Sequence, residues 1–498
     1  MPRQRTWARL ATALLTGLAA CLLVLVPMNA ATAAEPPATG KLAALRSGQL
    51  PLRVGTDATF PPFEFTDAQG NQLGFDVDLV RALAARAGIK NVEFVQMPFG
   101  NIVPALQANQ IDVGASAIYI SAERAKAVDF SDIYYPGGLA IFANEKDNSI
   151  ASLQDLAGKR VAVQVGTKSV EWLKQHQPAA QLITVQTNEQ MFSSARLGQA
   201  DAVVTGAPAG KYFIAQQGGL KQVGDRLTDE NYGYTFQKAD PELRDAFNTA
   251  LKQMRDDGSY QQVTEKWFGA ETTAAKPAEH PLFNVTTIIE SSGQIWQGLL
   301  VSIQVILSAL VLSLLLGTIG GFAKLSRIPP LRWLGTAYVS VIRGTPFVVQ
   351  LFFIYFGLPQ LGLQLPPMAA GIIALGLYSG SYVTEIFRGA VQSVDRGQLE
   401  AARSCGMSHA SSMRHVIIPQ AFLRMLPPLG NEFVSMTKNS ALVSFVTIHE
   451  LFLVGQTIIS RTFDALTVYL FIGLLYYLLT NLIGFATSTI EKKMAVYI

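Results

Sequence analysis

Cysteine is nearly absent from this chain of 498 residues, which contains only Cys21 and Cys405. Cys21 belongs to an expected N-terminal leader, so the mature chain has one cysteine and no partner for an intrachain disulfide. A cysteine-based zinc or redox site is excluded for the same reason. A Gly-x-x-x-x-Gly-Lys-Ser/Thr string is also missing. The chain therefore has no Walker-type loop in which to hold ATP.

Charged residues are scarce in one half only. Asp, Glu, Lys and Arg are frequent from about residue 40 to 280, whereas long stretches after Leu299 have almost none. The first part is typical of a soluble domain and the second of a membrane domain. The formal net charge of +3 is not gathered in a basic stripe with interleaved aromatic residues. We therefore expect no nucleic-acid partner.

The N-terminus predicts a secretory signal peptide over residues 1–34. Arg3, Arg5 and Arg9 precede an apolar run at 10–26, and small residues follow at 30–34. An uncleaved first membrane helix is the alternative interpretation. Cys21 lies inside the apolar run, which disfavours lipid attachment there. In either case, the chain after residue 34 is expected to lie outside the cytoplasm.

Strand and helix patterns alternate through residues 50–270. The expected strands lie at 52–56, 92–95, 111–115, 161–164 and 202–204, and the expected helices at 76–87, 102–108 and 169–175. This alternation predicts a mainly parallel α/β sheet. The segment is longer than one such sheet needs, and ligands of these folds bind at strand ends or between domains. We therefore expect a two-lobed clamp.

Several separated strings of this segment occur in the same order in one known family. Residues 54–65 read VGTDATFPPFEF, 74–79 read GFDVDL and 121–124 read SAER. VDFSD follows at 128–132, then GSY at 258–260 and KWFG at 266–269. Together they resemble the polar amino-acid-binding proteins of ABC importers, solute-binding family 3. The resemblance covers residues 50–270 and implies a type II periplasmic-binding-protein fold.

The resemblance assigns Arg124 to the carboxylate of the solute, a task that suits the planar, bidentate donor fork of arginine. Thr167 would add a donor from the second lobe. Phe60 and Phe99 would form aromatic walls, and Asp57 would contact the side chain or ammonium group of the solute. Outside such a motif, an arginine is usually a solvated surface charge and a phenylalanine usually a core residue.

Gln164, Ala117 and Tyr119 complete the expected ligand site, with Gln164 at a position that tunes side-chain preference in relatives. The family usually has glycine at position 117 and a small hydroxyl residue at position 119. It also has an aspartate near Gly206 that binds the ammonium group, and Gly206 cannot do so. Either Asp57 binds the ammonium, or the Tyr119 ring face does, or the solute has none. The expected substrate is an amino acid or a related small carboxylate.

The remaining chain predicts a linker at 271–294 and an all-α membrane domain at 295–498. Five apolar segments lie at 299–322, 346–361, 368–387, 433–454 and 466–487. Most are long enough to span about 30 Å of hydrocarbon. Lysines and arginines follow the first, third and fifth segments, which places those ends and the C-terminus in the cytoplasm. The sequence therefore predicts five transmembrane helices in the plasma (inner) membrane.

The loop after the third segment contains EAARSCG at 400–406, followed by IIP at 417–419. This resembles the EAA signature of ABC importer permeases, a cytoplasmic coupling helix that binds the ATPase subunit. Glu400 is expected to start the helix, Ala401 and Ala402 to permit close docking, and Gly406 to end it. The strings IRGTP at 342–346 and YVTEIFRG at 382–389 resemble polar amino-acid permeases in particular.

Partners follow from these motifs. Because the chain lacks a Walker loop, ATP with Mg²⁺ is expected on a separate ATPase subunit, in two copies. Five helices supply half of a gated pore, so we expect a twofold homodimer. Glu385, Glu432 and Lys438 are costly in hydrocarbon and should face the translocation path or pair within the protein. The alternatives are a ligand-gated channel or sensor, and an enzyme on the clamp fold such as a cyclohexadienyl dehydratase relative.

Overall fold

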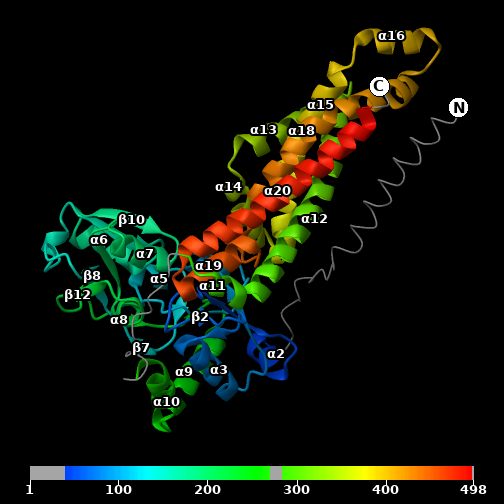
Figure 1. The fold of residues 1–498 in the computed structure, drawn as a ribbon. Coiled ribbons are helices and arrows are strands. Elements are labelled where there is room, and N and C mark those ends of the chain that lie inside the picture. The colour runs from blue at the N-terminus through cyan, green and yellow to red at the C-terminus, as the bar shows by residue number, and fades with distance from the viewer. Residues whose placement is uncertain (1–39, 270–282, 496–498) are drawn as a thin grey trace. The chain divides into compact units, whose positions relative to one another are not determined.

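The structure, a computed structural model, describes residues 40–269 and 283–495. The predicted signal peptide, residues 1–34, and residues 271–282 of the predicted linker lie outside the described residues. The chain forms two compact units. One contains residues 40–295 with 454–469, and the other contains residues 296–453 with 470–495. Figure 1 labels the elements of both.

The first lobe of the α/β unit is a five-stranded sheet in the order β4-β1-β5-β14-β6. β1 (Leu52–Thr56) pairs in parallel with β4 (Val92–Gln96) and β5 (Val113–Gly114). β14 (Thr235–Phe236) runs antiparallel to β5 and to β6 (Asp129–Phe130). The apolar face of α3 (Phe75–Arg86) is fully buried, as its helical periodicity predicts. The predicted strands and helices of this lobe are confirmed.

The second lobe is a five-stranded sheet in the order β10-β9-β11-β8-β12. β9 (Arg160–Gln164) pairs in parallel with β10 (Gln181–Val185) and β11 (Ala202–Gly206). β8 (Leu139–Asn144) runs antiparallel to β11 and β12 (Leu220–Val223). The sequence did not predict β8, because its fully buried apolar run has no period-two signal. Helices α6 (Lys168–His176), α7 (Asn188–Arg196) and α8 (Ala207–Gln217) belong to this lobe.

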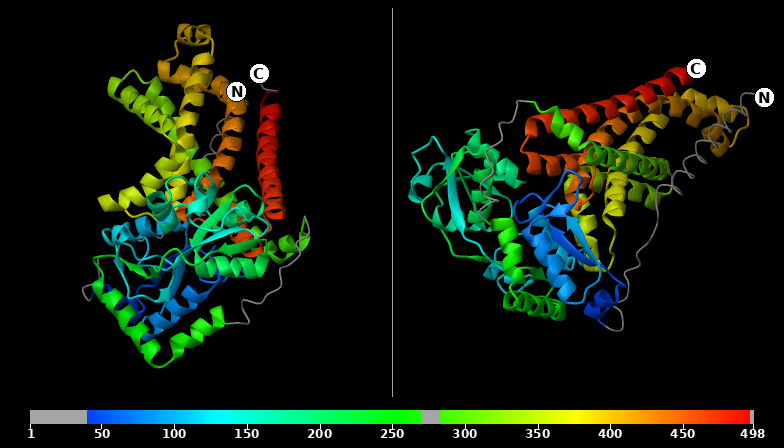
Figure 2. Two further views of the ribbon diagram at one scale, coloured as in Figure 1. Left: turned by 90° about the vertical axis from the view of Figure 1, so that its left-hand side faces the viewer. Right: turned by 60° about the horizontal axis from the view of Figure 1, so that its bottom comes forward.

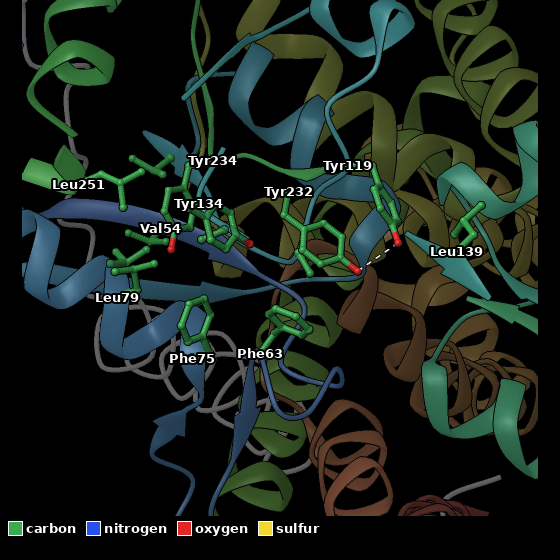
Figure 3. Close-up of a cluster of buried hydrophobic side chains, with 14 of the residues drawn as sticks. Val54, Phe63, Phe75, Leu79, Tyr119, Tyr134, Leu139, Tyr232, Tyr234 and Leu251 are labelled. Atoms are coloured by element: carbon green, nitrogen blue, oxygen red, sulfur yellow. Dashed lines mark hydrogen bonds between the residues drawn. The ribbon is translucent and has the colours of Figure 1, made fainter. Parts of the chain in front are cut away.

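Two short strands join the lobes. β7 (Tyr135–Pro136) pairs antiparallel with β13 (Asn231–Tyr232) where the chain leaves the first lobe and returns to it. Aromatic side chains beside this crossing form part of the core, and Figure 3 shows Phe63, Phe75, Tyr134, Tyr232 and Tyr234. The rings of Tyr134 and Tyr234 stack with centroids 4.1 Å apart. Full burial of each such ring contributes about 1.5–3 kcal/mol.

The remaining elements of this unit are short or peripheral. They are α2 (Lys41–Ser47), β2 (Phe65–Thr66), β3 (Gln72–Leu73), η1 (Phe99–Asn101), α4 (Ile102–Gln107), α5 (Ala122–Ala125), η2 (Gln154–Leu156), α9 (Pro241–Asp256) and α10 (Ser259–Phe268). α9 and α10 pack on α3 and return the end of the domain to the first lobe. α11 (Val285–Glu290) lies within the predicted linker, so the part of the linker that it forms is helical rather than a plain tether.

The chain from residue 292 onward is built from helices, of which α19 lies mostly in the first unit. They are α12 (Ser292–Leu325), α13 (Pro329–Gly344), α14 (Phe347–Phe352), η3 (Phe353–Gly357), η4 (Leu358–Leu361), α15 (Pro367–Ser393), α16 (Arg396–Ser404), α17 (His409–Ser412), η5 (Met413–Ile417), α18 (Ile418–Asn439), η6 (Ser440–Val446), α19 (Leu451–Thr462) and α20 (Ala465–Ala495). Three of the described helices, α12, α15 and α20, are long and apolar enough to span a membrane. With two bent pairs counted as single spans, the number reaches five. The count of five transmembrane spans therefore remains a prediction.

The bent pairs change the predicted limits of the second and fourth segments. α13 and the helical segment at 347–361 meet at 107°, and the predicted second segment contained only the latter part. The sequence did not predict α13, because Arg332 and Arg343 interrupt its apolar pattern. Gly344 and Pro346 allow the sharp bend. The bent pair that contains the fourth segment begins at His409, well before residue 433, and bends by 57° before α19.

Glycines bring α12 and α15 into close contact. A Cβ atom on Gly317 would lie 2.3 Å from Val383, one on Gly320 would lie 2.4 Å from Thr384, and one on Gly321 would lie 2.4 Å from Phe387. Small residues at such a spacing allow helix backbones to approach in a membrane, where packing rather than water exclusion drives association. This contact fixes α15, and α16 follows α15 directly at one end of the bundle in all views (Figures 1 and 2).

Candidate ligand site and coupling helix

A cavity lies between the two lobes of the α/β unit. From the first lobe it is lined by Asp57, Phe60, Phe99, Ser116, Ala117 and Tyr119. From the second lobe and the crossing it is lined by Gln164, Thr167, Ser169, Asn188, Thr205, Gly206 and Tyr232. Seven of the eight predicted ligand residues are therefore brought together, and Arg124 is the exception. The cavity is where a two-lobed clamp holds its ligand.

Asp57 is the charged side chain among the described residues that line the cavity. It follows β1 and is 4% exposed. Its carboxylate accepts hydrogen bonds from the Thr59 hydroxyl at 2.8 Å, the Gln164 amide at 2.8 Å and the Phe99 backbone N–H at 3.3 Å. Burial raises the pKa of Asp57 to about 6, and these donors oppose the shift. The group is thus an anion at neutral pH in a place that disfavours charge.

Two further carboxyl groups lie behind Ser116. The Ser116 hydroxyl accepts from the Asp57 backbone N–H at 3.2 Å and donates to Glu64 at 2.6 Å. Asp76 accepts from the Ala117 N–H at 2.9 Å and the Tyr134 hydroxyl at 2.8 Å. Burial raises the pKa of Asp76 to about 7 and that of Glu64 well above its usual range. Because burial disfavours the charged forms, the pair retains protons near neutral pH and adds less negative potential beneath the cavity than two carboxylates would.

Tyr119 and Tyr232 close another side of the cavity. Their hydroxyl oxygens are 3.2 Å apart and their ring centroids 4.6 Å apart (Figure 3). A Cβ atom on Gly206 would lie 2.3 Å from the Tyr232 hydroxyl oxygen, so no larger side chain fits there. Burial raises the pKa of both phenols, so they stay neutral at physiological pH. This wall offers hydroxyls and ring faces, without charge.

Ala117 has a backbone φ of 43°, in the left-handed region. A residue with a Cβ atom pays about 1–2 kcal/mol for this conformation, and glycine does not. The family pattern of glycine here thus has a structural reason, and Ala117 retains the same turn. The Ala117 N–H donates a hydrogen bond to the buried carboxyl group of Asp76, and this bond holds the turn in place.

Arg124 stands beside the cavity. Its guanidinium donates to the carbonyl oxygens of Tyr119 at 3.0 Å and Gly166 at 2.9 Å, and lies 5.5 Å from the centroid of the Phe99 ring. Because Gly166 belongs to the second lobe, Arg124 connects the two lobes. Thr167 donates its hydroxyl to the Gln164 carbonyl at 2.7 Å. The roles of Arg124 and Thr167 toward a carboxylate stay predictions.

Several lining residues were not predicted. Ser116 directly precedes Ala117, a predicted ligand residue, and this neighbour was an available signal. Asn188, whose amide donates to Gln164 at 3.1 Å, begins α7 and has no local sequence signal. Tyr232 reaches the cavity only because β13 returns from far along the chain. Such long-range placement cannot be read from periodicity.

α16 contains the EAA-like string and begins at Arg396, earlier than expected. Asp395 caps it by accepting from the Gly397 N–H at 2.7 Å, so Asp395, and not Glu400, supplies the anion at the helix start. Glu400 and Ala401 are exposed in mid-helix, whereas Ala402 is 7% exposed and packs against the chain itself. The docking role predicted for Ala402 is therefore corrected to an internal one.

Gly406 ends the helix as predicted. Its φ is +81°, its N–H donates to the Arg403 carbonyl at 3.0 Å, and the Met407 N–H donates to the Ala402 carbonyl at 3.2 Å. This left-handed ending favours glycine. Gly406 has nothing within 4 Å of the place a Cβ atom would occupy. The end of α16 therefore presents an open surface in this chain.

The predicted intramembrane charges divide into two groups. Glu385 forms ion pairs with Lys324 and with Arg388, the latter at 2.8 Å, so internal pairing is confirmed for it. Glu432 is half-buried and Lys438 is exposed, and neither forms an ion pair among the described residues. Their place on a translocation path stays a prediction.

Comparison with known proteins identifies both halves. Residues 52–270 match the family of bacterial extracellular solute-binding proteins, family 3. Residues 313–495 match the inner membrane component of binding-protein-dependent transport systems. The probable glutamine ABC transporter permease protein GlnM of Bacillus subtilis (strain 168) is 36% identical over 211 residues, covering 42% of this chain and 98% of the relative. The chain belongs to the amino-acid ABC transporter permeases. It is thus a multi-pass inner membrane protein with its own solute-binding domain.

Two more relatives represent the two halves. The arginine transport system permease protein ArtQ of Bacillus subtilis (strain 168) is 34% identical over 201 residues, covering 40% of this permease and 92% of ArtQ. An ancestral arginine-binding protein bound to arginine is 41% identical, with a TM-score of 0.42, and is matched over 44% of this permease and 98% of that chain.

Proposed function

We propose that this permease captures an amino acid or a related small carboxylate outside the membrane and passes it through a homodimeric pore driven by a separate ATPase subunit. The observation that carries the proposal is the presence, in one chain, of a ligand cavity between two lobes and an exposed helix with the EAA-like string. Relatives named for glutamine and arginine transport support the solute class.

The solute-binding domain supplies the capture step. Arg124 connects the lobes through the Gly166 carbonyl, and Gln164 of the second lobe donates to Asp57 of the first. Closure of the clamp thus joins polar groups from both sides of the cavity. A solute bound between them would stabilise the closed form, because it adds contacts that only that form provides. The fused domain remains near its pore at a high effective concentration.

α16 supplies the coupling step. Glu400 and Ala401 are exposed, and Gly406 ends the helix with open space where a Cβ atom would lie. These residues would bind in a cleft of the ATPase subunit, which would hold ATP with Mg²⁺. In this arrangement α16 and the C-terminus lie in the cytoplasm and the solute-binding domain lies outside. A twofold homodimer would present two α16 helices to two ATPase subunits.

The experiment uses the full chain reconstituted in nanodiscs with its ATPase subunit, and measures ATP hydrolysis and solute binding in parallel. Gly406→Ala forces a Cβ atom into a left-handed position and should lower solute-stimulated ATPase at least tenfold with solute binding unchanged. Gly473→Ala is the matched control, since this glycine lies in α20, has no positive φ and has open space around it. Unchanged stimulation in Gly406→Ala and in Glu400→Ala would refute the coupling role of α16.

A further inference from the structure

One acidic side chain lines the cavity between the lobes and is available to a bound solute. Asp57 lines it, 4% exposed, and the described residues place no cationic side chain in an ion pair with this carboxylate. Its three hydrogen-bond donors are neutral: a hydroxyl, an amide and a backbone N–H. A buried carboxylate with neutral partners is stabilised strongly by a cation that enters the cavity.

The other walls favour a cation but provide no second anion. Four aromatic residues, Phe60, Phe99, Tyr119 and Tyr232, line the cavity, and aromatic ring faces attract cations. The phenols are neutral, and no acidic side chain can be placed at Gly206 beside the Tyr232 hydroxyl. Two cationic groups of one solute would therefore compete for Asp57, and one of them would be desolvated without a counter-charge.

The buried carboxyl pair behind Ser116 does not supply that counter-charge. Glu64 is fully buried and Asp76 is 1% exposed, and neither lines the cavity. Burial also raises the pKa of both groups, so the pair does not act as a second anion for the solute.

We propose that the binding domain selects a small carboxylate with a single cationic group, seated at Asp57 between the aromatic rings, over solutes with two cationic groups. This selection rests on the proposed function. It places neutral amino acids and ω-amino acids among the substrates and disfavours arginine and lysine. The Arg124 guanidinium lies against the ring of Phe99, which lines the cavity. Arg124 is therefore the cation available to the carboxylate of the solute.

Calorimetry with the full chain in nanodiscs tests the selection directly. The probes are L-glutamine and 5-aminopentanoate with one cationic group, L-arginine and L-lysine with two, and glutarate with none. We expect at least one single-cation probe to bind at least about tenfold more tightly than arginine, lysine and glutarate. Tightest binding by arginine, lysine or glutarate would overturn the proposal, and so would the absence of binding by both single-cation probes.

Variants separate charge from shape. Asp57→Asn keeps the shape of the side chain and should weaken binding of the tighter single-cation probe at least tenfold. An unchanged affinity would overturn the role of Asp57.

Tyr119→Asp adds a second acid and space beside the cavity, so it should raise the affinity for arginine about tenfold relative to Tyr119→Asn, the matched control for lost volume. Equal arginine affinity in those two variants would contradict the charge argument. If arginine or lysine binds more tightly than the single-cation probes while solute still stimulates the ATPase, the proposed selection is wrong and the proposed function stands. If the α16 variants leave solute-stimulated ATPase unchanged, the proposed function is wrong.

Discussion

Replacing Asp57 by Asn should make the ligand-free solute-binding domain more stable at neutral pH. The carboxylate is 4% exposed, and burial raises its pKa from 3.8 to about 6. A shift of this size corresponds to about 3 kcal/mol against the charged form above pH 6. The amide avoids that penalty but has one acceptor oxygen for the donors of Thr59, Gln164 and Phe99, which costs about 1 kcal/mol. The net gain is about 2 kcal/mol at pH 8.

This effect depends on pH. Between about pH 4 and 6 the folded chain keeps a proton on Asp57 that the unfolded chain has lost, so wild-type stability falls as pH rises through this window. Below pH 4 both states are protonated and the advantage of Asn is absent. Hydrogen exchange of the β1 amides in the full chain, at pH 5 and pH 8, measures the local free energy of opening. An Asn variant no more stable than wild type at pH 8 would refute the reasoning.

The other predictions concern separate parts of the chain. Asp76→Asn should flatten the fall in binding-domain stability between about pH 4 and 7, because burial raises the pKa of Asp76 from 3.8 to about 7. An unchanged pH slope in hydrogen exchange would argue against this. Asp395→Ala should remove the cap of α16 at a cost of about 1 kcal/mol, seen as faster exchange of its first amides, with Glu290→Ala as an exposed control. Gly321→Leu should separate α12 from α15 and lower the thermal stability of the membrane unit, since even a Cβ atom would meet Phe387 at 2.4 Å, and an unchanged melting temperature would contradict this packing.

Local patterns predicted much of the binding domain. The strand at 52–56 and the helix around Val80 have clear periodicity, and the structure contains both as β1 and α3. β8 was missed because a buried strand has no alternating pattern, although it lies within the second sheet. Tyr232 was missed because its place in the cavity depends on pairing between β7 and β13. Contacts of this range are set by topology rather than by local sequence.

The membrane unit shows the same division. The apolar runs of α12, α15 and α20 are long enough to be found by composition. α13 was missed because Arg332 and Arg343 interrupt its apolar pattern. The start of α16 was placed too late because the EAA-like string begins at Glu400, whereas the capping residue is Asp395. A capping residue just before the motif was a usable signal.

In the proposed function, one chain both captures the solute and couples its binding to ATP hydrolysis. The most direct measurement is the ATPase rate of the reconstituted complex as solute is added, with no separate binding protein present. We predict a saturable, solute-dependent increase in that rate, which the Asp57→Asn variant loses. An increase that requires an added binding protein, or one that persists unchanged in Asp57→Asn, would contradict the account.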